Sequence, residues 1–567
     1  MRNLILLIAV LVLNTGHSQI FTSPTGNEVS MSVEDGLLRI NRAFYGILTT
    51  VEDLVGFTVS ESTAEFYRLD AYSALYGHSP GTGQWFGTPD NHLFDMMSDD
   101  ALKGTDAGDQ PDMSLLETYQ WTGFNSLTSR NQGLHSKMSH GIESVENSMR
   151  ILGQNPPQSD HDMLIAELKF LRAHFRFELK RVFNEGSWSA IELDYLDAIP
   201  NLPTAHGPSW PKGRPTMLMA RAMLGKAHLY QRDWSNALSQ FNIVISSGTY
   251  SLRPQFKQIW SSLYERNDTE GIFTVNFQSR SSGYSGDWSM GSGINYESTS
   301  RGLNHPYITP WGCCGFFQAN QDIVDFFQTT SNGLPKLDGS WKSNHITNPN
   351  GASVGEPIGN PSVDPRLDWT VGRPGILYNN HHIYQIDYVR DLTYAGPYFT
   401  KKHIGFPEEF GIQGWGNITA VNHHILRYAD LLLMAAEASV ELGDLETARG
   451  YVNQIRMRAS NPLGFVPEAI QGGTRVEYTT TSNPAANYNI SQYTTAWTSQ
   501  AEARTAVRYE RRLELAHEGH RMFDLWRWGN ARGVLNDYLS RESRYRAYLQ
   551  GVRYSQPNHL PSPASLN

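Results

Sequence analysis

The chain has 567 residues, of which 40% are hydrophobic and 11% are aromatic, so it can bury a large core. With 46 Lys and Arg residues against 56 Asp and Glu residues, its formal net charge is −10, which excludes a general attraction to nucleic acid. It contains only two cysteines, so no disulfide framework holds the fold.

Residues 1–18 have the pattern of an export signal. Arg2 gives a positive start, Leu4 to Leu13 form an unbroken apolar run, and small residues precede a cut before Gln19. The run is too short to span a membrane as a helix. We therefore expect an exported chain with one domain over residues 19–567.

Before residue 200, apolar residues recur at the spacing of amphipathic helices. The predicted helices cover about 30–60, 66–75, 121–149 and 162–182. The first depends on Val33, Leu37, Ile40, Phe44, Ile47 and Leu48. Ser159 and Asp162 resemble a capping box at the start of the last.

Two later stretches have the pattern of a helix hairpin. In the first, Pro215 occupies the first helical position and Asp233 caps the partner helix. In the second, a helix runs from Leu426 to Leu442 and Asp444 caps its partner. The matched partner-helix residues are Trp234 with Leu445, Ala237 with Ala448, Phe241 with Val452 and Val244 with Ile455. A small Ala followed four residues later by a large apolar residue is typical of tetratricopeptide-type hairpins.

Between the hairpins, about 250–425, the residues are mainly Gly, Ser, Asn, Pro and aromatic, which predicts a large loop-rich lobe. A second stretch of this kind covers 462–500. The predicted fold class is therefore mainly α. Tetratricopeptide-like helical hairpins form a scaffold over about 30–250 and 425–550, and the irregular lobe lies on it.

Residues 506–529 form a charged helix followed by aromatic residues. Glu510, Glu514 and Glu518 share one helix face, and Arg511 can reach Glu514 at i+3. Charge pattern alone favours a solvated, salt-bridged face. The aromatic residues directly behind the charges favour a packed, partly buried ion network instead. We interpret the stretch as a structural clasp that ties the last helices to the scaffold, away from any ligand.

Five segments, taken in order, resemble motifs of the SusD-like (RagB/SusD) family of outer-membrane nutrient-binding proteins. They are Glu167 to Phe175, Pro215 to Ile245, Asp364 to Leu367, Leu426 to Ala438 with Ile455 to Ala459, and Glu510 to Gly529. The resemblance implies a tetratricopeptide-based helical body with an irregular lobe. It also implies a location on the outer face of the outer membrane of a Bacteroidetes-type bacterium.

The resemblance further implies a function as a glycan-binding protein. Such a protein captures oligo- or polysaccharide and delivers it to a SusC-like TonB-dependent transporter, without catalysis and without a cofactor. Some family members bind peptides, so a peptide ligand is an alternative. The family is usually lipid-anchored through a cysteine after the signal. No cysteine lies near Gln19, so we expect attachment through the transporter.

Aromatic rings bind the apolar face of sugars, and polar side chains bind the hydroxyls around it. The candidate ligand-binding residues are Trp85 and Asn91 in an early loop, and Tyr284, Trp288, Tyr307 and Trp311 in the lobe. Packing of these rings within the lobe is the alternative. Four other tryptophans are assigned to the core, namely Trp121, Trp234, Trp526 and Trp528.

Other chemistry-bearing residues give weaker patterns. Cys313 and Cys314 are interpreted as buried thiols, slightly ahead of a strained bridge between neighbours. The pairs His381–His382 and His423–His424 lack the spacing of zinc ligands. The acidic run at 95–109 lacks EF-hand order, so a solvated loop is favoured over calcium. No catalytic motif is evident. A helical glycoside hydrolase is the remaining enzymatic alternative.

Overall fold

The structure is a computed structural model that describes residues 61–75, 92–120, 125–154, 160–261, 263–264, 268–275, 306–308, 314–346, 361–409 and 421–557. It also gives the backbone of three strands near the N-terminus. Helices predominate in the described residues, which confirms the predicted mainly α fold class. No helix in these ranges is both long and apolar enough to cross a membrane.

The three N-terminal strands form an antiparallel sheet in the order β1-β2-β3. They cover Gln19–Thr22, Glu28–Glu34 and Leu37–Ile40. The prediction of a helix from residue 30 is therefore wrong as far as residue 40. Apolar Val29, Met31 and Val33 alternate with serines, and this period of two suits a strand better than a helix. Residues 41–60 lie outside the described residues.

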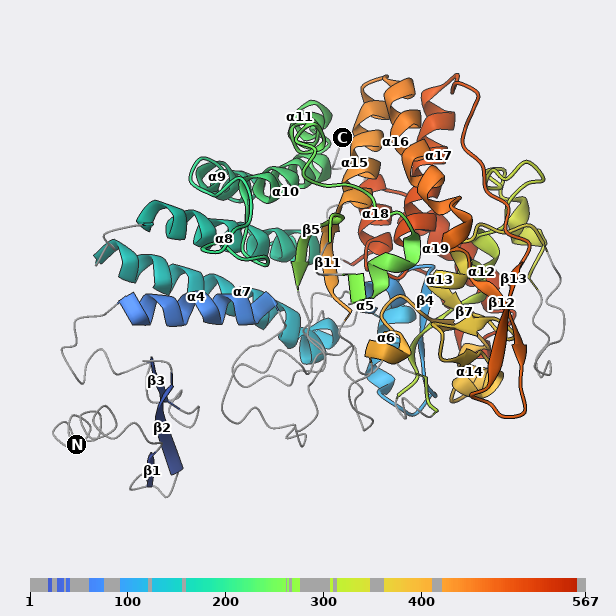
Figure 1. Ribbon diagram of the computed structural model, residues 1–567, viewed down its shortest axis with the longest axis horizontal. Coiled ribbons are helices and arrows are strands. Elements are labelled where there is room, and N and C mark those ends of the chain that lie inside the picture. The colour runs from blue at the N-terminus through green and yellow to red at the C-terminus, as the bar shows by residue number, and fades with distance from the viewer. Residues whose placement is uncertain are drawn as a thin grey trace.

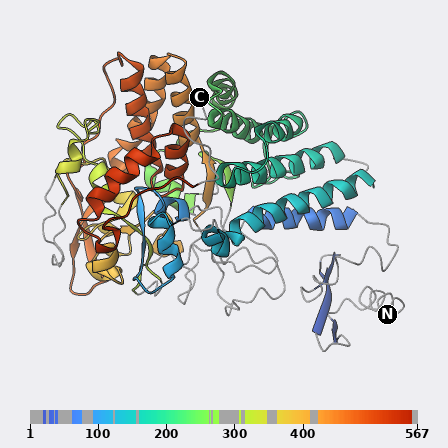
Figure 2. The same ribbon diagram turned by 180° about the vertical axis from the view of Figure 1, so that it is seen from behind.

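Six helices form a stack on one side of the molecule, as Figures 1 and 2 show from opposite sides. They are α4 (Glu61–Leu75), α7 (Asn125–Gln154), α8 (His161–Phe183), α9 (Trp188–Ala198), α10 (Met217–Tyr230) and α11 (Trp234–Ser246). Each helix packs against the next one in this order. The helices predicted at 66–75, 121–149 and 162–182 are confirmed within one to a few residues.

Helix starts differ in detail from the sequence interpretation. Asp160, which precedes α8, has left-handed backbone, and its side chain makes no capping bond. Ser159, the first residue of the capping box predicted there, lies outside the described residues. Thr216 caps α10, so the first helical position is Met217 and not Pro215 as predicted. The hydroxyl of Thr216 accepts from the backbone N–H of Met219 at 3.3 Å. Asp233 caps α11 in the same way, as predicted.

The second helical group contains α15 (Tyr428–Glu441), α16 (Leu445–Ala459), α17 (Gln500–Leu515), α18 (Arg521–Trp528) and α19 (Ala531–Glu542). The predicted hairpin of α15 and α16 is confirmed, with Asp444 as cap. Its first helix starts later than predicted, because Leu426 and Arg427 belong to strand β11 (His423–Arg427). This strand pairs with β5 (Gly271–Val275), and Figure 1 shows the pair between the two helical groups.

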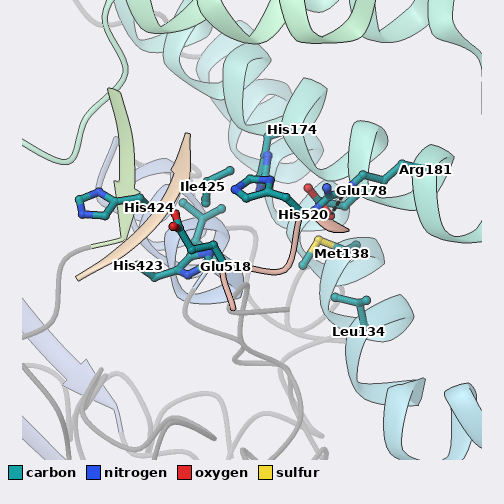
Figure 3. A pocket seen from close by; sticks show the side chains of 11 residues that line it. Leu134, Met138, His174, Glu178, Arg181, His423, His424, Ile425, Glu518 and His520 are labelled. Carbon is teal, nitrogen blue, oxygen red and sulfur yellow. Dashed lines mark hydrogen bonds and ion pairs between the residues drawn. The ribbon is translucent and has the colours of Figure 1, made fainter. Parts of the chain in front are cut away.

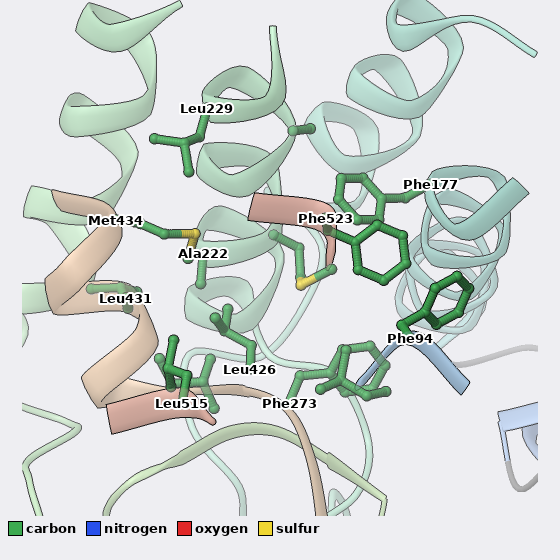
Figure 4. Packing of buried hydrophobic residues seen from close by; sticks show 14 of the residues in the cluster. Phe94, Phe177, Ala222, Leu229, Phe273, Leu426, Leu431, Met434, Leu515 and Phe523 are labelled. Carbon is green, nitrogen blue, oxygen red and sulfur yellow. The ribbon is translucent and has the colours of Figure 1, made fainter. Parts of the chain in front are cut away.

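One hydrophobic core runs through both helical groups. Figure 4 shows Phe177, Leu229, Phe273, Leu426 and Phe523 packed together, although they come from the stack, from β5, from β11 and from α18. The tryptophans assigned to the core, Trp234, Trp526 and Trp528, are partly buried and pack against this cluster. Trp121 lies outside the described residues.

The lobe consists of short elements. Its helices are α5 (His92–Met96), α6 (Ser114–Glu117), α12 (Gln321–Phe326), α13 (Leu367–Thr370) and α14 (Leu392–Ala395). Its strand pairs are β4 (Ala101–Gly104) with β6 (Phe316–Ala319), β7 (Val371–Gly372) with β10 (Phe399–Thr400), β8 (Leu377–Tyr378) with β9 (His382–Ile383), and β12 (Pro467–Gln471) with β13 (Tyr478–Pro484). Three smaller hydrophobic clusters stabilise it.

The row of charges is buried, so a solvated face is wrong and an ion network is confirmed. Because α17 ends at Leu515, Glu510 and Glu514 share a helix face as predicted, but Glu518 lies beyond the helix. Glu510 and Glu514 are fully buried, and Glu518 is only 6% exposed. Their cationic partners come from four other segments: Arg366 before α13, Lys402 after β10, Arg427 in β11, and Arg456 and Arg458 in α16. The predicted pair of Arg511 with Glu514 is wrong, because Arg511 binds Asp430 and Asp524 instead.

The network keeps Glu514 and Glu518 ionised. Burial alone raises the pKa of Glu518, but Arg427 and Lys402 outweigh it and lower the pKa to about 2. Glu514 behaves alike: burial opposes ionisation, and Arg458, Arg427 and Arg366 hold its pKa well below the usual range. Arg366, Arg427 with Arg456, and Glu514 come from three of the five sequence motifs, and the fold brings them into one charge cluster.

Candidate functional site

Of the six predicted ligand-binding residues, Tyr307 lies within the described part of the chain. Trp85, Asn91, Tyr284, Trp288 and Trp311 lie outside the described residues, so their positions remain predictions. Tyr307 is 46% exposed, whereas Pro306 before it is buried and Ile308 after it is half-buried. The ring therefore projects from the lobe between two anchored neighbours.

A cluster of tyrosines anchors the backbone of Tyr307. Its N–H donates to the carbonyl oxygen of Tyr388 at 3.0 Å. Tyr388 is buried with Tyr378 and Tyr384, at ring-centroid distances of 5.5 and 4.5 Å, and Ile308 packs against the same cluster. A cluster of large rings gives a rigid base, since aromatic side chains have few rotamers and bury much area.

Arg390 lies over the ring of Tyr307, with its Cζ 5.1 Å from the ring centroid. The same guanidinium pairs with two carboxylates of an early loop: Nε lies 2.8 Å from Asp106 and Nη1 lies 2.7 Å from Asp109. Nη1 also donates to the hydroxyl of Thr105 at 3.1 Å. These five residues, Tyr307, Arg390, Thr105, Asp106 and Asp109, are called the Tyr307 face.

The loop that carries Asp106 and Asp109 is fixed from within. One oxygen of Asp106 accepts from the backbone N–H groups of Gly108 and Asp109, at 2.8 and 2.9 Å. The buried ammonium of Lys103 donates to the carbonyl oxygens of residues 106 and 109, at 2.8 and 2.7 Å. A buried lysine thus holds two carbonyl oxygens of this loop in place.

The first half of the acidic run is not solvated, contrary to prediction. Asp95, Asp99 and Asp100 are buried. Asp99 pairs with Arg521 at 2.8 Å and Asp100 pairs with Arg512 at 2.8 Å. These carboxylates therefore attach the early loop to α17 and α18, and the structure leaves only Asp106 and Asp109 near the surface.

The backbone beneath the Tyr307 face has four residues in the left-handed region. They are Gly104 (φ 77°), Thr105 (φ 53°), Gly315 (φ 83°) and Phe317 (φ 58°), at one end of the β4–β6 pair. A side chain at Gly104 would lie 2.5 Å from the carbonyl oxygen of Gly315, so glycine is required there. A bulky residue such as Phe317 in this region marks a strained backbone, which is more frequent near binding sites.

Cys314 precedes this strained segment and is disulfide-bonded, so the interpretation as a buried free thiol is wrong for it. Cys313 is the other cysteine of the chain. Cys314 is half-buried and packs against the main hydrophobic core.

The histidine pairs have structural partners. His381 binds the carbonyl oxygen of Gly405 at 2.8 Å, and His382 lies 3.1 Å from the hydroxyl of Tyr388. His423 and His424 line a hollow with His174 and His520, shown in Figure 3. Within the described ranges, no three His, Cys, Asp or Glu side chains are grouped so that they could hold a metal ion.

The hollow in Figure 3 offers paired or neutral groups. Glu178 pairs with Arg181 at 2.7 Å, and Glu518 belongs to the ion network. Burial lowers the pKa of His174 and of His520 to about 4, so both imidazoles are neutral at neutral pH. All its lining side chains are almost completely buried. The Tyr307 face is therefore the better candidate for a ligand from solution.

Sequence reasoning found Tyr307 from its residue type and its place in the loop-rich stretch. It missed Arg390, because a single arginine in such a stretch forms no pattern. It noted Asp106 and Asp109 only as part of an acidic run. Their partner is more than 280 residues away in the chain, and no local spacing indicates a contact of that kind.

Comparisons with known proteins agree on one family. The sequence profile of the SusD family matches residues 269–562. SusD-like protein P38 from Formosa agariphila is 22% identical over 330 residues, which cover 55% of this chain and 52% of that protein. The chain thus spans about half the length of this curated relative.

Two solved structures share the fold over most of the chain. A laminarin binding SusD-like protein has a TM-score of 0.59 and 21% identity, with 89% of this chain and 96% of that chain covered. Surface glycan-binding protein A from Bacteroides thetaiotaomicron, in complex with laminarihexaose, has a TM-score of 0.59 and 18% identity, covering 88% and 96%. At this identity the likeness shows the fold.

Proposed function

Because this chain belongs to the SusD family, we propose that it is a cell-surface glycan-binding protein. It captures an oligosaccharide or polysaccharide and delivers it to a SusC-like TonB-dependent transporter in the outer membrane. It acts by binding and has no enzymatic step. An exported chain with a single domain over residues 19–567 fits this role.

The observation that carries the proposal is the exposed, braced ring of Tyr307. An exposed aromatic ring on a rigid base can pack on the apolar face of a sugar, and neighbouring polar groups can bind its hydroxyls. Arg390, Asp106 and Asp109 bind one another beside the ring and hold it in place. In this proposal Trp85, Asn91, Tyr284, Trp288 and Trp311 complete the binding site.

The similar structures suggest which glycan to test first. One of them is named as laminarin binding, and another was solved in complex with laminarihexaose. Laminarin and laminarihexaose are both built from glucose. Laminarin is therefore the first probe, and starch, xylan and mannan extend the test to other neutral backbones.

Native gel electrophoresis with each polysaccharide in the gel tests binding. We expect at least one of the four to retard the chain, with no release of reducing ends over hours. Time-dependent release of reducing ends would show a glycoside hydrolase instead. If none of the four retards the chain, the proposed binding of neutral glycans is wrong, and a peptide ligand becomes the better interpretation.

Delivery to a transporter is tested separately. A tagged copy of the full chain is purified from outer membranes of its own host in mild detergent. We expect a TonB-dependent transporter to co-purify in near-equal amounts, as identified by mass spectrometry. If the chain is recovered without one, the proposed partner is wrong, although glycan binding could still hold.

A further inference from the structure

Among the residues that the structure describes, Arg390 connects the ring of Tyr307 to fixed groups of the lobe. We propose that Arg390 is a positioning residue for ligand binding. It braces one face of the Tyr307 ring, so that the opposite face stays turned toward the sugar. The inference rests on the proposed function and identifies a residue that acts through Tyr307, without itself having to touch the ligand.

The guanidinium cannot turn freely, because different nitrogens bind different partners. Nε binds Asp106 at 2.8 Å, while Nη1 binds Asp109 at 2.7 Å. Charge-assisted bonds to a planar guanidinium fix its orientation as well as its position. The side chain of Arg390 is 34% exposed and those of its two partners 28% and 26%, so the pairs are partly shielded from water.

The two carboxylates are fixed in turn by buried groups. Lys103 is fully buried and binds the carbonyl oxygens of residues 106 and 109. The N–H of Thr105 donates to the carbonyl oxygen of Gly315 at 2.6 Å, which ties the loop to β6. A continuous set of contacts therefore runs from a buried ammonium to the guanidinium over the Tyr307 ring, whose Cζ lies 5.1 Å from the ring centroid.

Among the described residues, two contacts hold Tyr307: its backbone N–H bond to Tyr388 and the guanidinium of Arg390 over its ring. The N–H of residue 307 binds Tyr388, but about half of the side chain is exposed. An exposed ring without the guanidinium can change rotamer, and a ligand must then restrict it on binding. A cation–π contact at an exposed site contributes about 0.5–1 kcal/mol, so we expect Arg390→Ala to weaken glycan binding about two- to fivefold.

A double-mutant cycle separates positioning from general damage. The dissociation constant for laminarin, or for whichever of starch, xylan and mannan retards the wild-type chain most, is measured for four proteins. These are the wild type, Arg390→Ala, Tyr307→Ala and the double variant. We expect Tyr307→Ala to weaken binding about tenfold or more, as truncating a central aromatic contact does. In the Tyr307→Ala background, Arg390→Ala should then have no further effect.

Arg504→Ala is the matched control. Arg504 on α17 also binds a carboxylate through two nitrogens, Glu441 at 2.6 and 2.8 Å, and is 31% exposed. It lies in the helical group, so its loss should leave the dissociation constant unchanged. A second set, Asp106→Asn with Asp109→Asn, should reproduce the effect of Arg390→Ala, because it frees the guanidinium while Arg390 remains present.

The outcomes distinguish this inference from the proposed function. If Tyr307→Ala weakens binding and Arg390→Ala does not, the brace is wrong and the glycan site stands. If the two single effects add in the double variant, Arg390 does not act through Tyr307, which also overturns the inference. If the wild type binds none of the four polysaccharides, the proposed function fails and the inference fails with it.

Discussion

At the scale of single residues, the ion network makes Glu514 the most sensitive position. It accepts from Arg366, Arg427 and Arg458 and is fully buried. Glu514→Gln keeps the shape but leaves three buried cations short of one negative charge. We expect the free energy of unfolding to fall by about 3–5 kcal/mol, as for other broken buried pairs, measured by chemical denaturation.

The matched control for this change is Glu446→Gln on α16. Glu446 also pairs with an arginine, Arg449, but its side chain is 67% exposed. Such an exposed pair is screened by water and contributes far less to stability than a buried one. Equal losses for the two variants would contradict the special role of the buried network.

Glu117 gives a pH prediction. Burial raises its pKa to about 7 from an ordinary 4.5, against the opposing N–H of Lys103. The folded chain therefore holds this proton more tightly than the unfolded chain does. Its stabilising effect is complete below about pH 4.5 and is lost as the pH rises through 7.

We expect Glu117→Gln to flatten this dependence. Between pH 5 and pH 7.5, the unfolding free energy of the wild type should fall by about 2 kcal/mol more than that of the variant. The measurement is chemical denaturation of both proteins at several pH values. Parallel curves would show that Glu117 does not carry the proton. Burial also raises the pKa of Glu542 to about 7. Its contribution to the pH dependence should be the same in both proteins, so it cancels in the comparison.

At the scale of elements, close helix packing depends on glycines within helices. A Cβ at Gly225 of α10 would lie 2.6 Å from Cε1 of Phe241 on α11. Alanine is normally the better helix former by about 1 kcal/mol. At Gly225 the steric overlap with Phe241 should outweigh this gain in helix propensity. We therefore expect Gly225→Ala to destabilise the chain by about 1–3 kcal/mol.

Gly450 on α16 is the control, because a Cβ there would meet no atom within 4 Å. Gly450→Ala should raise the midpoint of thermal unfolding, while Gly225→Ala should lower it. Two shifts of the same sign would mean that the α10–α11 hairpin can open to accept a methyl group.

The same elements show what sequence reasoning could reach. Helices with a long apolar stripe, such as α8 and α11, were predictable because one repeated face decides their packing. The starts of α8 and α10 were not predictable in the same way. The start of α8 depends on the left-handed backbone of Asp160, and that of α10 depends on one hydrogen bond to the hydroxyl of Thr216. The strands β2 and β11 were missed because short apolar runs fit either period.

At the scale of the whole molecule, the limit was long-range pairing. The motifs around Arg366, Arg427 and Glu514 could be placed in chain order, and a clasp could be inferred from the charge row. Which cation binds which carboxylate could not be predicted, because partners such as Arg427 and Glu270 are 157 residues apart. The same holds for Arg390, whose role depends on a loop near residue 106.

The ion network and the Tyr307 face share no side chain among the described residues, which gives a prediction for the molecule as a whole. Arg427 binds Glu270, Glu514 and Glu518 from one buried guanidinium. A lysine has a single ammonium and cannot span these carboxylates, so Arg427→Lys should lower the unfolding free energy by about 3 kcal/mol. Its glycan affinity, measured well below the unfolding temperature, should stay within about twofold of the wild type, which is less than 0.5 kcal/mol.

Tyr307→Ala should show the reverse pattern, with weaker glycan binding and an unfolding free energy changed by less than about 0.5 kcal/mol, as is usual for exposed positions. The two variants together test whether stability and recognition reside in separate parts of the fold. A loss of affinity in Arg427→Lys as large as that in Tyr307→Ala would show that they are coupled. The charge cluster would then be part of the binding machinery, because the rigidity of the lobe would depend on the helical group beneath it.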